Sequence, residues 1–352
     1  TILFKTKEPL CMAHVTFPLT SLSDLGALTR DLPQADVAAQ DAARDRQNAL
    51  TKPPGSLGRL EELAVFMAGW QQQAVPQIDF AQALVFAGNH GICAQGVNPF
   101  PQEVTAQMVQ NFKAGGAAIN QLCHVNDARL SVIDLDLDRP TADFTEGPAM
   151  TEAECLAALN AGAAALHPAA SVLILGEMGI GNSTVAAALT AAVFGGAVQD
   201  WVGRGTGADD EGVRRKVDAI TRGLARHTAT PQDGAAILTA LGGREQAAIC
   251  GAVLAARQRR VPVILDGFIC TASVAPLFAL SPATLDHCLI GHLSVEPGHR
   301  RLLDAIGKTA VLDFDMRLGE GSGAALALGI LRAALACHSG MATFAEAGVA
   351  GG

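Results

Sequence analysis

A glycine-rich turn near the middle of the chain is the clearest candidate for a ligand site. Residues 173–184 read Leu-Ile-Leu-Gly-Glu-Met-Gly-Ile-Gly-Asn-Ser-Thr, and the alanine-rich residues 184–194 are expected to form a helix. Glycines let the backbone approach a ligand, and the first N–H groups of a helix form a natural seat for phosphate. Glu177 places a carboxylate beside this seat. The combination favours a ligand that is anionic at one end and carries or develops positive charge at the other.

The same turn argues against two common nucleotide-binding classes. It lacks the Gly-Lys-Ser/Thr ending of a P-loop and the Gly-x-Gly-x-x-Gly spacing of a dinucleotide site. An NTPase or an NAD-dependent enzyme is therefore disfavoured. The candidate phosphate and ribose contacts are Gly179, Gly181, Asn182, Ser183 and Thr184.

A second loop, residues 316–324, reads Met-Arg-Leu-Gly-Glu-Gly-Ser-Gly-Ala and precedes an alanine- and leucine-rich segment of helical type. Most loop glutamates are simply solvated, but the glycines around Glu320 leave its carboxylate open to a ligand. We expect Glu320 on an exposed turn at a helix start, where the helix dipole favours the ionised form. An ionised carboxylate in a snug site is a usable general base.

Two further segments offer weaker candidates. Residues 203–216 contain a Gly-x-Gly-x-Gly turn with Gly205 at its centre, followed by cations that end at Lys216. Two interpretations are open: these cations contact a phosphate, or they form a solvated face of a helix. Asn89 and His90 follow an apolar run, and no second histidine stands at ligand spacing nearby, so a metal site is not expected.

Phe100 and Met108 lie downstream of His90 in the sequence. They either line an apolar slot for a flat ring or belong to the ordinary core.

The elements that must position these residues are short apolar runs alternating with helical segments. The expected strands are 83–87, 130–135, 172–175, 261–265 and 288–290, with helices such as 245–258 and 322–336 between them. This alternation predicts an α/β fold with a mostly parallel sheet covered by helices on both faces. Polar residues follow several strand ends, namely Asn89, His90, Glu177, Asp266 and His292, and we expect them to converge on one site.

Before these strands, residues 22–73 are expected to be helical. Pro53 and Pro54 break this stretch, and Ser56 is expected to cap the helix that follows.

Composition narrows the class of protein. The chain has 352 residues, a net charge of −9, no tyrosine and no long basic run, which disfavours nucleic-acid binding. Its eight cysteines include no C-x-x-C pair, so we expect free thiols in a reducing cytoplasm. The apolar stretch 185–198 is too short to span a bilayer. Residues 1–11 precede Met12, a possible start, and are expected to be an upstream segment without a function.

Five motifs in this order resemble the nicotinate-nucleotide–dimethylbenzimidazole phosphoribosyltransferase family of cobalamin biosynthesis. They are Lys52-Pro-Pro-Gly-Ser-Leu-Gly-Arg-Leu-Glu61, Asn89-His-Gly91, residues 176–184, Leu265-Asp-Gly-Phe268 and residues 317–325. The resemblance implies a Rossmann-like core over residues 76–315. It also implies a smaller helical domain built from residues 12–75 and 316–352, and a cytoplasmic homodimer.

The resemblance further implies a reaction, the transfer of the 5-phosphoribosyl group of nicotinate mononucleotide to 5,6-dimethylbenzimidazole, without a metal or cofactor. The family's catalytic glutamate falls on Glu320 and its second site glutamate on Glu177. Its phosphate loop falls on residues 179–184, assisted by Gly205 and Lys216. The base-pocket positions are Asn89, His90, Phe100, Met108, Arg317 and Leu318.

Phe100 and Met108 stand where some family members carry small or polar residues, which leaves the preferred base open. Transfer to another base or a phenolic acceptor, or a catalytically silent nucleotide-binding protein on this fold, are the alternatives.

Overall fold

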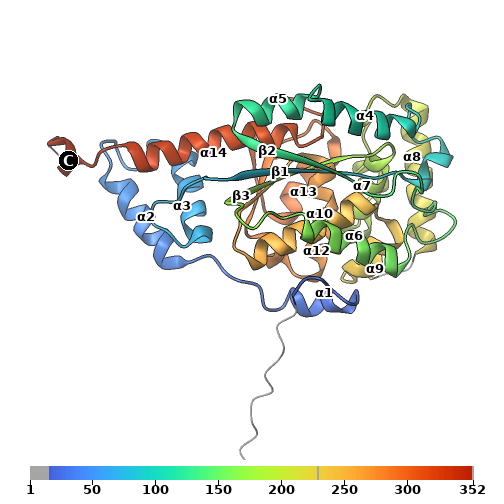
Figure 1. The fold of residues 1–352 in the computed structure, drawn as a ribbon. Helices are drawn as coiled ribbons and strands as arrows, with labels where there is room; N and C mark the ends of the chain where they lie inside the picture. The colour runs from blue at the N-terminus through green and yellow to red at the C-terminus, as the bar shows by residue number, and fades with distance from the viewer. Residues whose placement is uncertain (1–15, 228–229, 351–352) are drawn as a thin grey trace, which may run out of the picture.

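A six-stranded parallel sheet forms the centre of the molecule in the computed structural model, which describes residues 16–227 and 230–350 (Figure 1). The strand order is β2-β1-β3-β4-β5-β6. The expected α/β fold is confirmed, whereas the expectations for residues 1–11 and for Cys11 lie outside the described residues. The strands are β1 (Ala81–Ala87), β2 (Ala128–Asp134), β3 (Val172–Met178), β4 (Val263–Leu265), β5 (Cys288–His292) and β6 (Ala310–Leu312).

Alternating side chains of the strands pack into two different cores. All seven residues of β1 are buried; Leu84 and Phe86 point into one core, and Ala83 and Val85 into the other. One face is covered by α3 (Arg59–Gln71), α4 (Glu103–Ala114), α5 (Ala118–Val125) and α14 (Ser322–Gly340). The other is covered chiefly by α6 (Glu152–Ala164), α10 (Arg244–Gln258) and α12 (Ala275–Leu280).

A third core lies among the helices that follow the strand ends. It joins α7 (Asn182–Phe194), α8 (Asp210–Arg226), α9 (Gly234–Leu241), α11 (Phe268–Ser273) and α13 (Pro297–Ile306). Short 3-10 turns connect these elements at Gly91–Gln95, Val198–Asp200 and Pro282–Leu285.

The strand order changes direction between β1 and β3. The chain moves from β1 to β2 on one side, whereas β3 and the later strands lie on the other side. In open parallel sheets ligands bind outside the carboxyl ends of the strands at such a switch point. Phe86 pairs with Glu177, and the Gly88 N–H donates to the Met178 carbonyl at 3.0 Å. The loops after β1 and β3 therefore run side by side at this edge.

Helices from both ends of the chain pack together beside the sheet (Figure 1). α2 (Val37–Ala49) and α3 lie against α14, and the Arg46 Nε donates to the His338 carbonyl at 2.7 Å. An isolated bridge joins Leu50 to Thr343, just before the short α15 (Phe344–Ala347).

By contrast, α1 (Ser23–Leu28) buries Leu25 and Leu28 in the core under α6 and α10. The first helix of the N-terminal segment therefore packs with the large sheet rather than with α2 and α3.

The proline-containing break between α2 and α3 is fixed by charged side chains. The Lys52 Nζ lies 2.7 Å from the Glu61 Oε1, which also accepts from the Leu57 N–H. α3 begins after Gly58, whose φ is +52°, so the predicted cap at Ser56 is wrong by two residues. The Arg59 Nη2 donates to the Thr309 carbonyl at 2.9 Å and ties this turn to the edge strand β6.

One described helix, α14, is long and apolar enough to cross a membrane by length and composition. Half of it is buried inside the protein, where Leu328 and Leu331 pack against the sheet. The apolar character of α14 is therefore explained by its packing in the core. The seven cysteines in the described part of the chain are all free thiols, as expected.

Candidate active site

A cavity opens at the carboxyl ends of β3, β4 and β5. Its wall is completed by residues 97–99, residues 205–206 and the turn that carries Glu320. Ten of the residues predicted for the site line this cavity: Glu177, Gly179, Gly181, Asn182, Ser183, Gly205, Lys216, Arg317, Leu318 and Glu320. The sheet thus brings together segments that lie far apart in the sequence, because parallel strands end at the same edge.

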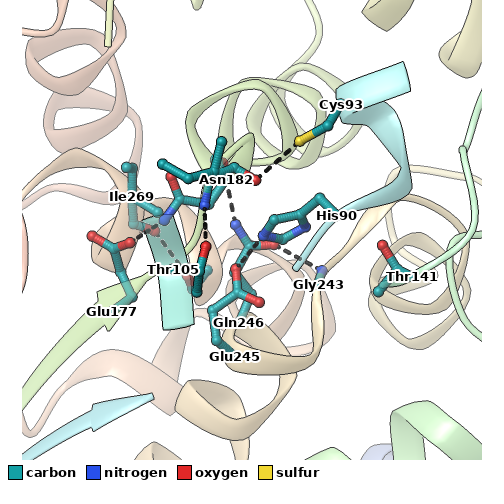
Figure 2. A network of polar contacts seen from close by, with 12 residues as sticks. His90, Cys93, Thr105, Thr141, Glu177, Asn182, Gly243, Glu245, Gln246 and Ile269 are labelled. Atoms are coloured by element: carbon teal, nitrogen blue, oxygen red, sulfur yellow. Dashed lines mark hydrogen bonds and ion pairs between the residues drawn. The ribbon is translucent and has the colours of Figure 1, made fainter. Parts of the chain in front are cut away.

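The glycine-rich turn is held from behind by side chains of other segments (Figure 2). The Ile180 N–H donates to the Thr105 hydroxyl at 3.1 Å, and the Cys93 thiol donates to the Ile180 carbonyl at 3.2 Å. Gly181, with φ of +97°, turns the chain into α7, whose first residues Asn182 and Ser183 face the cavity. These contacts hold in place the start of α7, which the sequence predicts to be an anion seat.

Thr184 has a different place from the rest of the turn. It is completely buried and does not line the cavity. Its backbone N–H donates to the Gly181 carbonyl at 3.0 Å. Thr184 therefore belongs to the packing of the turn, and its predicted contact with a phosphate stays a prediction.

Lys216 places its ammonium group beside the start of α7. Its side chain comes from α8, is 3% exposed, and places Nζ 3.0 Å from the Ser183 Oγ and 3.3 Å from the Gly203 carbonyl. Burial lowers the pKa of this ammonium, and the nearby Glu296 carboxylate opposes that effect. Glu296 also accepts from the Gly205 N–H at 2.9 Å, which joins the 203–205 turn to the same end of the cavity.

Glu320 occupies a buried turn rather than the exposed one expected from the sequence. Its side chain is 7% exposed, and its own backbone has a φ of +65°. Gly176 of β3 makes this burial possible, because a Cβ there would collide with the backbone of Gly321. Burial, and then the negative charge of Asp266, raise the pKa of Glu320 to about 7. The sequence led us to expect that the helix dipole favours the ionised form, but burial and the charge of Asp266 shift this group toward its protonated form.

Glu177 lies beside Glu320 at the end of β3. It is 4% exposed, and its Oε2 accepts from the Asn182 side-chain amide (Figure 2). Burial raises its pKa well above the ordinary value, and the charges of Asp266, Glu245 and Glu320 add to this effect. A buried carboxyl of this kind takes its negative charge most readily when a cation enters the cavity.

Asp266 follows β4, and His292 is the last residue of β5. Both line the cavity with Glu177, in agreement with the predicted convergence of strand ends, whereas Asn89 and His90 do not. The Asp266 carboxylate accepts from the Gly321 N–H at 3.1 Å and from the Ala324 N–H at 2.8 Å. The His292 Nε2 lies 3.8 Å from the Asp266 Oδ1. The start of α14 is thus tied to the end of β4.

Four residues assigned to the base pocket lie outside the lining of the cavity. His90 is fully buried behind the turn, with its Nε2 2.9 Å from the Glu245 Oε1 (Figure 2), and the Asn89 amide donates to the Leu137 carbonyl. Phe100 is 46% exposed, and Met108 packs on the core beneath α14. Their contact with a base therefore stays a prediction.

Glu245, Thr105 and Glu296 were missed from the sequence. Glu245 stands inside a helical segment that carried no motif, Thr105 lies well beyond the histidine loop, and Glu296 follows β5 without a flanking glycine pattern. Only Glu296, which comes soon after a strand end, carried a usable positional signal. Within residues 16–227 and 230–350, no group of three or more histidine, cysteine or acidic side chains is arranged to hold a metal ion.

Comparison with known proteins agrees with this geometry. Residues 32–349 match the DBI_PRT family model, described as phosphoribosyltransferase. A nicotinate-nucleotide–dimethylbenzimidazole phosphoribosyltransferase from Rhodobacter capsulatus is 62% identical over 94% of this chain and 98% of its own length. One of the same name from Ruegeria pomeroyi is 57% identical over 95% of this chain and 99% of its own length.

A solved structure of a similar protein has the same fold. The crystal structure of CobT from Thermus thermophilus superimposes with a TM-score of 0.83 and 43% identity, over 90% of this chain and all of that one. The family match extends from α2 to the end of the described chain and includes every segment that lines the cavity. The chain belongs to the nicotinate-nucleotide–dimethylbenzimidazole phosphoribosyltransferase family.

Proposed function

We propose that this protein transfers the 5-phosphoribosyl group of nicotinate mononucleotide to 5,6-dimethylbenzimidazole, giving α-ribazole 5′-phosphate and nicotinate. The observation that carries the proposal is the position of Glu320. A buried carboxyl with a pKa of about 7 shares one cavity with a helix-start anion seat and a buried lysine. The names of relatives 62% and 57% identical to the chain support the same pair of substrates.

The phosphate of the mononucleotide binds at the lysine end. The N–H groups at the start of α7, the Ser183 hydroxyl and the Lys216 ammonium are donors that fit a phosphate dianion. Binding replaces the weak contact of Lys216 with a neutral carbonyl by a full ion pair. The phosphate is held and is not transferred, so its role is to orient the ribose.

The ribosyl carbon lies toward the acidic end, where Glu177 and Glu320 meet. The C1′–N bond breaks with its electron pair moving to the pyridinium nitrogen, so nicotinate leaves as an uncharged ring and needs no general acid. Positive charge develops on the ribose as an oxocarbenium. The Glu177 carboxylate stabilises this charge in a site from which water is largely excluded.

The benzimidazole attacks C1′ from the face opposite the leaving ring, which inverts the β linkage to α. One ring nitrogen forms the new bond, and the proton on the other becomes acidic as attack proceeds. Glu320 accepts this proton. A pKa of about 7 suits the task, because the base is partly ionised at neutral pH and becomes fully ionised beside a cationic donor. Leu318 and Arg317 border the cavity next to this base.

The direct test is product formation by the purified protein. Nicotinate mononucleotide and 5,6-dimethylbenzimidazole are incubated together, and the products are identified by liquid chromatography with mass spectrometry and by the anomeric proton coupling in NMR. Stoichiometric nicotinate and the α-configured ribotide are expected. Nucleotide binding without nicotinate release, with every acceptor in a panel of benzimidazoles, purines and phenols, would contradict the proposal.

The same proposal includes the wider organisation of the protein. It includes a homodimer in the cytoplasm, with a large part at 76–315 and a smaller part from 12–75 and 316–352. The free thiols and the packing of α2 and α3 with α14 support it, whereas α1 packs on the large sheet. Light scattering of the purified protein tests the dimer.

A further inference from the structure

A buried aspartate at the end of β4 has no part in the reaction steps above, although it lines the cavity. Asp266 is 1% exposed and follows directly after Leu265. Its side chain does not point into open solvent or pair with an arginine or lysine in the described part of the chain. It is instead directed at the backbone of the turn that carries Glu320.

The contacts of Asp266 define what it holds. One carboxylate oxygen accepts from the Gly321 N–H at 3.1 Å, and the other accepts from the Ala324 N–H at 2.8 Å. These are N–H groups at the start of α14, which have no partner within the helix. The residue whose position they determine is Glu320, immediately before Gly321. Within the turn, the Ser322 N–H and hydroxyl both donate to the Gly319 carbonyl.

Asp266 is also an electrostatic neighbour of the proposed base. Its negative charge is, after burial, the cause that raises the pKa of Glu320. The other charged and titratable side chains that line the cavity around Glu320 come from β3, α8, the end of β5 and its own turn: Glu177, Lys216, His292, Glu296 and Arg317. Of these and Asp266, only Asp266 contacts the backbone beside Glu320 through hydrogen bonds.

We propose that Asp266 is the positioning residue of this site: its carboxylate fixes the turn that carries Glu320 onto the end of β4 and places a second negative charge beside that base. The two effects act through Glu320 and not on the substrate. The inference rests on the proposed function, in which Glu320 is the general base.

Asp266→Asn separates this role from general packing. Asparagine has the same shape, but it carries no charge, and its amide nitrogen faces an N–H donor in place of one acceptor oxygen. We expect kcat to fall about 10- to 100-fold because the Glu320 carboxylate is displaced from the position in which it accepts the proton. We also expect the acidic limb of the kcat–pH profile to move down by about one pH unit, because a like charge beside Glu320 is removed.

A double-mutant cycle provides the second readout. If Asp266 acts through Glu320, Asp266→Asn adds less than about a threefold loss in the Glu320→Gln background. A loss there as large as in the wild type overturns the inference. So does an acidic limb that stays in place in Asp266→Asn. Asp313→Asn, which removes an exposed carboxylate from the segment leading into the same turn, is the matched control and should change neither quantity.

Folding of the variant is checked by circular dichroism and by calorimetric binding of nicotinate mononucleotide. If Asp266→Asn does not fold, Asp266→Glu tests the proposal: kcat should fall while the acidic limb stays in place, since the charge remains but the acceptor moves. Full activity of that variant overturns the positioning role. A wild-type protein that forms no ribotide would refute the proposed function itself, whereas an active wild type with an unshifted Asp266→Asn profile refutes only the role of Asp266.

Discussion

Replacing Glu320 with glutamine is expected to stabilise the protein at alkaline pH while it removes most of the activity. Glutamine keeps the size of the side chain but cannot ionise. In the folded protein, burial and the charge of Asp266 raise the pKa of Glu320 from 4.5 to about 7. The ionised carboxylate is therefore less favourable in the fold than in the unfolded chain, and the native enzyme retains it for catalysis at a cost in stability.

The sign of the pH dependence of stability follows from the difference between the pKa of Glu320 in the folded protein and in the unfolded chain. A carboxyl group with a raised pKa binds more protons in the folded state, so its contribution to stability is complete below pH 4.5 and is lost as the pH rises to about 7. At about 1.4 kcal/mol per pH unit the loss is about 3 kcal/mol at most. Solvent screening in a cavity open to ligands reduces this to about 1–2 kcal/mol.

Guanidinium unfolding of Glu320→Gln and wild type, at pH 5 and pH 8 and at one protein concentration, measures the effect. The variant should be more stable by about 1–2 kcal/mol at pH 8 and by much less at pH 5, with an unchanged denaturant slope. The matched control Glu62→Gln, an exposed glutamate of α3, should change stability by less than about 0.5 kcal/mol at either pH. Equal stability differences at the two pH values would refute a pKa of Glu320 raised by burial.

The activity of the same variant is measured by nicotinate release and ribotide formation. Loss of the general base should reduce kcat by about 10²- to 10⁴-fold, while binding of the mononucleotide changes little. Near-normal kcat would remove Glu320 from the reaction.

Three further outcomes follow from the same geometry. Lys216→Met should raise KM for nicotinate mononucleotide about 10- to 100-fold with a smaller change in kcat, since a charged hydrogen bond to phosphate is lost; an unchanged KM would contradict its role. The kcat/KM of the wild type should fall below a pH of about 7, because Glu320 of the free enzyme is then protonated; a flat kcat/KM profile from about pH 5.5 to 8 would contradict the assignment. Glu245→Ala removes the buried partner of His90 and should lower stability by about 3 kcal/mol; an unchanged melting temperature would show that the pair does not support the turn.

The centre of the sheet could be predicted from the sequence because β1 and β3 are apolar runs closely followed by glycines. β1 and β3 are buried along almost their whole length, and such strands are recognisable without knowledge of their partners. β6 was missed because it has only three residues, Ala310 to Leu312, and pairs along one edge with β5. Its existence depends on the neighbouring strand rather than on its own pattern.

That Glu320 belongs to the cavity could be predicted from the sequence, whereas its environment could not. The glycines around Glu320 indicated a functional carboxylate, but its burial depends on Gly176, far earlier in the chain, which admits the turn to the edge of β3. The raised pKa of Glu320 follows from that burial. It therefore cannot be predicted from the residues around position 320. His90 illustrates the same limit, because its partner Glu245 is supplied by a helix whose sequence gives no sign of a buried charge.

The two ends of the cavity differ in charge in a way that links donor binding to the activation of the base. The lysine end suits a phosphate, whereas burial raises the pKa values of the carboxyls Glu177 and Glu320 and so favours their protonated forms in the free protein. A pyridinium ring beside them favours their ionised forms, so the bound donor itself supplies the conditions for the base to accept a proton. After neutral nicotinate departs, the positive charge remains on the ribose and then on the benzimidazole, next to the same carboxylates. The base is therefore ionised while positive charge is present and reverts toward the protonated form when the neutralised product leaves.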